Sequence, residues 1–160
     1  MITLAESHWP LSDVDTVPAL AGFVESSFSP LAAEVARRCL GSATPKPGPA
    51  TAVIIVSSTG DLATARATAR AVDTRGRLGP LLFFQAVPNA VAGYIAAKWN
   101  LQGPVVCLSP AEPDLADGFA VADLLFRDGD ANQALIISVE QAQAEGERDT
   151  ARAVLVKGAV

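Results

Sequence analysis

The sequence has few of the residues that cross-link a chain or bind metals. Only two of its 160 residues are cysteines, Cys39 and Cys107, and its single histidine is His8. Two cysteines exclude a disulfide framework, and with one histidine they provide no typical set of metal ligands. Charged residues make up 18% of the chain and the net charge is −5, so we expect neither nucleic acid nor an anionic membrane as a partner.

Long apolar runs are also missing. No stretch approaches the roughly 20 apolar residues of a spanning helix, and the start, "MITLAESHWP", has no basic segment typical of a secretion signal. We therefore predict a cytoplasmic protein. Half of the residues are hydrophobic, which suffices for the core of a single domain covering residues 1–160.

The first 50 residues contain one clear element and no repeat. "SPLAAEVARRCLG" predicts a helix, with Ser29 as its cap and Gly41 at its C-terminal stop. Leu31, Val35 and Cys39 recur at helical spacing, which places Cys39 in the core. The stretch "SATPKPGPA" that follows reads as a loop.

From residue 51 onward, predicted strands and helices alternate. Short β-branched runs predict strands at 52–56, 105–109, 134–139 and 151–156, and helices are expected near 61–72, 89–100 and 114–126. One apolar side of the first of these helices would carry Leu62, Ala65, Ala69 and Val72. The alternation predicts an α/β layered fold with a mixed, mainly parallel sheet covered by helices.

Several residues are candidates for chemistry. The turn Ser57–Gly60 between a strand and a helix is similar to the FMN-phosphate loop of flavodoxins, although small polar residues also cap ordinary helices. His8 is more often a surface or subunit-contact residue than a ligand. Cys107 lies within the apolar run "VVCLS", which favours a buried and unreactive thiol. Phe83 and Phe84 would line a pocket or, more commonly, join the core.

The order of motifs after residue 51 resembles the N-terminal half of a β-ketoacyl synthase, of the thiolase superfamily. Residues 1–50 match this pattern poorly, so the recognisable core is 51–160. The matching residues are Ser58, Gly60, Phe83, Phe84, Asn89, Ala92, Gly93, Leu101, Gly103, Pro104, Gly129, Asp130, Ala131 and Glu140.

The resemblance places Glu112 where the family has its nucleophilic cysteine. The family's tight turn uses small residues whose N–H groups form part of an oxyanion hole, whereas Pro113 has no N–H to donate. The two catalytic histidines of the family come from a C-terminal half that has no counterpart here. The resemblance therefore implies no catalytic residues, with Glu112 at a degenerate nucleophile position, and no cofactor.

Three functions follow as alternatives. The first is a non-catalytic, chain-length-factor-like partner or structural protein of a type II fatty-acid or polyketide-like pathway. It would pair as a homodimer, or as a heterodimer with a ketosynthase-like chain, and could also meet an acyl carrier protein. The resemblance puts this dimer interface at Val105, Val106, Cys107 and Leu108. The second is an acyl-thioester-processing enzyme that uses Glu112, and the third is a flavodoxin-like binder of FMN or phosphate.

Overall fold

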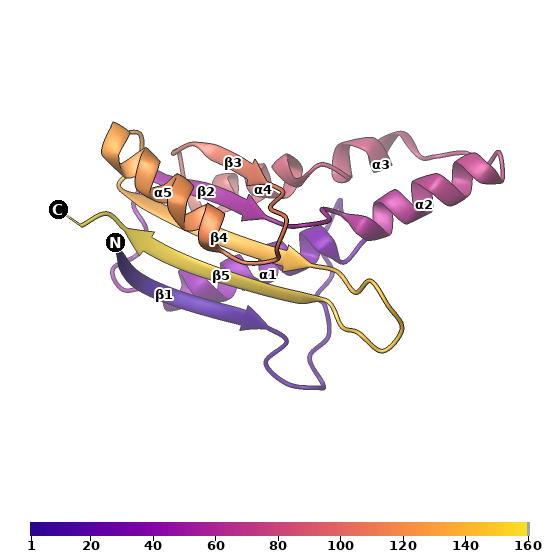
Figure 1. Ribbon diagram of the computed structural model, residues 1–160, viewed down its shortest axis with the longest axis horizontal. Helices are drawn as coiled ribbons and strands as arrows, with labels where there is room; N and C mark the ends of the chain where they lie inside the picture. The colour runs from indigo at the N-terminus through magenta and orange to yellow at the C-terminus, as the bar shows by residue number, and fades with distance from the viewer. Residues whose placement is uncertain (160) are drawn as a thin grey trace.

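A five-stranded sheet runs through the computed structural model (Figure 1). The structure describes residues 1–159, and at Pro80 and Leu81 only the backbone. The strands follow the spatial order β1-β5-β4-β2-β3. They are β1 (Ile2–Trp9), β2 (Thr51–Val56), β3 (Val105–Leu108), β4 (Gln133–Glu140) and β5 (Thr150–Lys157). The predicted mixed sheet is confirmed: β3, β2 and β4 are parallel, and β5 and β1 are added antiparallel.

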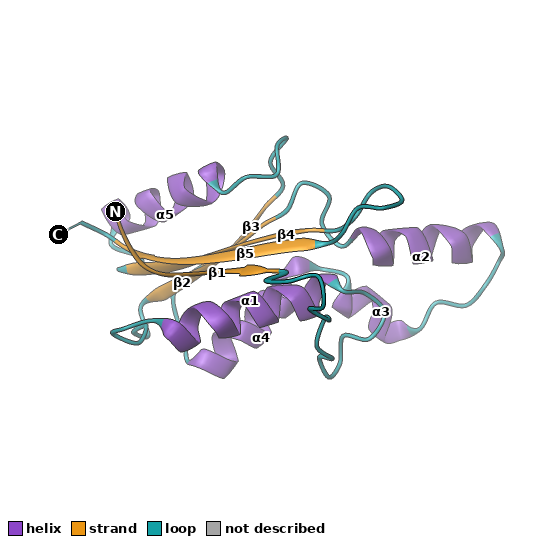
Figure 2. Ribbon diagram, turned by 90° about the horizontal axis from the view of Figure 1, so that it is seen from below, coloured by secondary structure: helices purple, strands orange, loops and turns teal. Residues whose placement is uncertain are grey.

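Helices cover both faces of this sheet (Figure 2). They are α1 (Phe28–Ser42), α2 (Leu62–Asp73), α3 (Pro80–Gln85), α4 (Pro88–Trp99) and α5 (Ala116–Asp128). Helices α1 and α4 lie on one face, α5 lies on the other, and α2 and α3 extend beyond the sheet. Because both of its faces are covered, every residue of β2 is buried, as its uninterrupted apolar run predicts.

Helix α1 forms where its pattern predicts, and Leu31, Val35 and Cys39 are fully buried against the sheet. Its start differs from the prediction. Ser27 is the N-cap residue, and Ser29 lies inside the first turn with a buried hydroxyl.

Strand β1 has no counterpart in the sequence prediction. It pairs antiparallel with β5, and Trp9 at its end is buried. A register shift between Thr3 and Ala5 interrupts the regular alternation of inward and outward side chains. That irregularity conceals the two-residue period on which recognition of a strand depends.

The part of the chain from α2 to α3 departs furthest from expectation. Val72, expected on a packed side of α2, is 67% exposed, and Thr64 is the buried residue of that helix. Phe83 and Phe84, expected in a pocket or the core, are 76% and 68% exposed on α3. These side chains are exposed because both helices lie past the end of the sheet (Figure 2).

Among the helices of residues 1–159, α5 alone packs on its face of the sheet (Figure 2). Its inward positions are Gly118 and Ala122, which are buried, and Leu115 just before it is buried as well. Phe119 is half-buried. Gly129 ends α5 in the left-handed conformation, with φ 79°, as expected for the Asp-Gly turn.

Candidate functional site

The candidate site lies where the three parallel strands end. The carboxyl ends of β2, β3 and β4 lie together at one end of the sheet, which is where α/β proteins generally have their sites (Figure 1). Three segments leave the sheet there: the turn 57–60 before α2, the turn 109–115 before α5, and residues 140–141 after β4.

The turn before α2 is held by protein groups. The carboxylate of Glu140 accepts hydrogen bonds from the Ser58 backbone N–H and from its hydroxyl, both at 2.7 Å. Ser109 donates to the Ser58 carbonyl at 3.1 Å and so joins this turn to the one before α5. The donors that a phosphate would use at Ser58 are therefore taken up by a carboxylate, which argues against the flavodoxin-like interpretation.

A second network joins the turn before α2 to the segment before α1. The Gln141 side-chain amide donates to Ser27 at 2.8 Å and accepts from the Ala63 N–H at 3.0 Å. Asp61 accepts from the Ser26 hydroxyl at 2.6 Å and from the Thr64 N–H at 3.0 Å. These bonds fix the start of α2. Sequence reasoning missed the network, although Asp61 three residues before Thr64 is a recognisable N-cap signal.

The turn 109–115 brings Glu112 to the surface just before α5. Glu112 is exposed, and its carbonyl accepts a hydrogen bond from the Asp114 N–H at 2.9 Å. The Asp114 side chain accepts from the Ala116 N–H at 2.7 Å, at the first residue of α5. Asp114, and not Glu112, therefore occupies the N-terminus of α5, so the alternative in which Glu112 processes an acyl thioester gains no support from this geometry.

The two thiols lie in different environments. Cys39 is fully buried in the core, and burial raises the pKa of its thiol to about 11. Cys107 is exposed, contrary to the prediction that it is buried, because β3 is an edge strand. Its sulfur donates to the Asn89 side-chain oxygen at 2.9 Å, and partial desolvation by neighbouring atoms raises its pKa although solvent reaches it.

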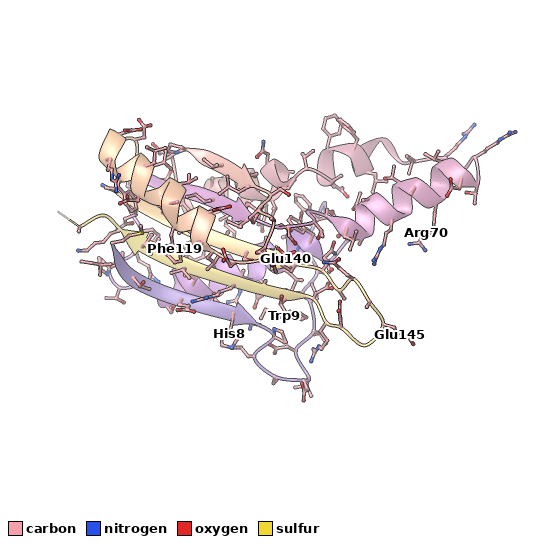
Figure 3. The ribbon with its side chains drawn as sticks, viewed as in Figure 1. His8, Trp9, Arg70, Phe119, Glu140 and Glu145 are labelled. Atoms are coloured by element: carbon pink, nitrogen blue, oxygen red, sulfur yellow. The ribbon has the colours of Figure 1, made fainter. Side chains whose placement is uncertain are left out.

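His8 lies closer to the site than its sequence position suggests. A cleft of ≈ 420 Å³ is bounded by the end of β1, the turn before α5 and the ends of β4 and β5. His8, Asp114, Glu140 and Arg152 line this cleft (Figure 3 labels His8 and Glu140). His8 pairs with Arg152 across the two antiparallel strands, and the Arg152 guanidinium donates to Glu6 at 2.8 Å. Charged side chains of both signs therefore line the cleft.

A mixed sheet with α5 on one face, entered by a turn at the carboxyl ends of parallel strands, is a thiolase-like half-fold. The sequence from residue 4 to residue 150 matches the family described as β-ketoacyl synthase, N-terminal domain. The chain belongs to that family. The match includes most of the segment before Thr51.

Solved structures with the same fold include a β-ketoacyl synthase and chains of ketosynthase/chain length factor structures. A chain from the ketosynthase (ApeO) and chain length factor (ApeC) complex of Xenorhabdus doucetiae aligns at 20% identity and a TM-score of 0.73, over 94% of this chain. The ishigamide ketosynthase/chain length factor aligns at 20% identity and 0.70, also over 94%. A β-ketoacyl synthase from Burkholderia phymatum aligns at 15% and 0.69, over 92%.

The chain spans 65%, 49% and 47% of the length of those three chains, respectively. No curated protein sequence matches it. Among the described residues, no helix has the length and apolar character needed to cross a membrane.

Proposed function

We propose that this protein is a non-catalytic, chain-length-factor-like partner in a fatty-acid or polyketide-like pathway of the cytoplasm. The observation that carries the proposal is the turn before α5. The order of motifs in the sequence puts Glu112 at the position of the family's nucleophile, and there the Glu112 side chain is exposed and Pro113 supplies no N–H. A carboxylate there cannot form the thioester intermediate that a cysteine would form.

The nearest thiol supports the same proposal. Cys107 precedes the nucleophile position by five residues and lies within β3, whereas the turn begins after that strand. Its raised pKa keeps the sulfur protonated at neutral pH, and a protonated thiol is a poor nucleophile. Among the described residues, no group of three or more potential ligands could hold a metal ion that would activate it.

The open edge of the sheet supports a role in association. The carbonyls of Pro104 and Leu108 accept hydrogen bonds from β2, at 2.9 and 3.1 Å. Alternate residues of a strand face opposite neighbours, so the backbone groups of Val105 and Cys107 point away from the sheet. An apolar edge strand with free backbone groups invites pairing with another strand.

We infer that β3 pairs with the same strand of a second chain, which is either another copy or a ketosynthase-like protein. Pairing of two such edges around a two-fold axis would satisfy both sets of backbone groups. Two of the similar solved structures contain a ketosynthase together with a chain length factor, which favours the second kind of partner. An acyl carrier protein would then meet the assembly rather than this chain alone.

Light scattering coupled to size-exclusion chromatography tests this inference. We expect the unmodified protein at micromolar concentration to have the mass of a dimer, or to form a 1:1 complex with a ketosynthase of the same organism. Val105→Lys is the informative variant, because Val105 is 42% exposed and its replacement puts a charge into the apolar edge strand that would pair.

Thr3→Lys is the matched control, because Thr3 is exposed on β1, the other edge strand of the sheet. It should leave the complex intact, whereas Val105→Lys should give a folded monomer. A soluble monomer that binds no ketosynthase, or equal effects of the two substitutions, would contradict the proposal.

A further inference from the structure

A cavity separate from the candidate site lies between α2, the start of α3 and the segment before α1. It measures ≈ 480 Å³, within the range of small-molecule sites, and is open on one side. Its walls are mainly apolar and include Val24, Ala67, Ala71, Leu78 and Leu82. Helix α2, which carries part of its wall, lies beyond the sheet (Figure 2).

A much smaller hollow of ≈ 10 Å³ adjoins the cavity, and Glu25 and Gln85 line both. Space of this size holds about one water-sized group. Ser29 lines the small hollow and is only 2% exposed. Its hydroxyl has no hydrogen-bond partner within the described part of the chain. A buried hydroxyl without a partner costs about 1–3 kcal/mol, so a group that bonds to it is stabilised there.

The charges around the hollow determine which kind of chemical group can bind there. Two carboxylates, of Glu25 and Asp61, line it, and none of the described residues that line it is basic. Asp61 already accepts hydrogen bonds from Ser26 and Thr64, and its negative charge remains nearby. The first turns of α1 and α2 also line this hollow, but each helix N-terminus carries only about half a positive charge and Asp61 already caps α2. The two full negative charges therefore favour a group that donates hydrogen bonds and carries positive charge over an anion.

We propose that this cavity binds a small aliphatic molecule with a primary ammonium group. The ammonium occupies the small hollow and donates to the Ser29 hydroxyl, near the Glu25 carboxylate. The aliphatic chain lies in the larger cavity against Ala67, Ala71 and Leu82. This site does not depend on the proposed function, because it uses neither β3 nor the turn before α5.

The first part of the test compares two ligands of equal chain length. Hexylamine, which is protonated at pH 7, and hexanoate are titrated against the ¹⁵N-labelled protein, and amide shifts are followed by NMR. We expect hexylamine to bind, with shifts confined to the residues around the cavity, and hexanoate to bind at least tenfold more weakly. Arg77 on the wall of the larger cavity is the group that would favour hexanoate. Equal or tighter binding of hexanoate would therefore overturn the proposal.

The second part uses variants. Ser29→Ala removes the hydroxyl and should weaken hexylamine binding about fivefold, the value of one hydrogen bond. Ala71→Trp fills the cavity and should abolish binding. Ala69→Trp is the matched control, because Ala69 lies on the same helix, is exposed and does not line the cavity. No binding by the unmodified protein would show that the hollow holds only water, and equal effects of the two tryptophan variants would place the ligand elsewhere.

Discussion

Gly118 controls how closely α5 approaches the sheet, and replacing it with alanine gives a sharp test of that packing. A Cβ atom at this position would lie 2.6 Å from a methyl carbon of Ile136 and 3.0 Å from one of Val56. Both methyl groups belong to fully buried, β-branched side chains of central strands, which cannot rotate away freely. Inserting a methyl group into such a contact costs about 1–3 kcal/mol.

Helix propensity acts in the opposite direction, because alanine is favoured over glycine inside a helix by about 1 kcal/mol. Gly93→Ala isolates this term. Gly93 lies inside α4, is exposed, and has no atom within 4 Å of its added Cβ. We therefore expect Gly93→Ala to stabilise the protein by up to about 1 kcal/mol and Gly118→Ala to be less stable than it by about 1–3 kcal/mol.

Urea denaturation followed by circular dichroism measures both free energies of unfolding. Equal denaturant dependence in the two variants would show that the unfolded states are comparable. If the two substitutions changed the free energy by the same amount within about 0.5 kcal/mol, α5 would not pack against β2 and β4 as described.

Two further predictions concern stability. Phe119→Ala should cost about 2 kcal/mol, less than the 3–5 typical of a fully buried ring, since Phe119 is half-buried; a cost below about 0.5 kcal/mol would show that α5 is detached. Hydrogen bonds from Arg37 and then Arg38, at 2.8 and 2.7 Å, hold the pKa of Glu34 at about 2, below its usual 4.5. That stabilisation is present above pH 4.5 and lost as the pH falls towards 2. The free energy of unfolding of the unmodified protein should exceed that of Glu34→Gln by about 1 kcal/mol at pH 7, and this advantage should shrink in that window. An unchanged advantage in urea melts at pH 2.5 would refute this ion pair.

Local sequence patterns correctly predicted the elements whose structure depends on a single feature, such as an apolar run or a helical spacing. The apolar run of β2 and the helical spacing of Leu31, Val35 and Cys39 led to the correct core. The run of β3 looks similar in sequence but lies at an edge, and this difference depends on strand order, which periodicity does not encode. The exposure of Cys107 follows directly from that position.

The site, like the fold, was predicted from the sequence only in part. The turn before α5 and its Glu112 were located from the order of motifs. The bonds that fix the neighbouring turn before α2 were not predicted, because Glu140 and Ser58 are 82 residues apart in the chain and meet only through the pairing of β2 with β4. The cleft beside His8 is likewise a product of tertiary structure, since it joins β1 with β4 and β5.

Intact-mass spectrometry after incubation with an acyl-CoA or an acylated carrier protein tests the central claim, that this chain is non-catalytic, most directly. A full-length ketosynthase with its cysteine is the positive control. We predict that the unmodified protein keeps its original mass, because the turn before α5 has no cysteine and Cys107 is held as a thiol. A stable acyl adduct that a Cys107→Ser variant no longer forms would contradict the account and place a working nucleophile on β3.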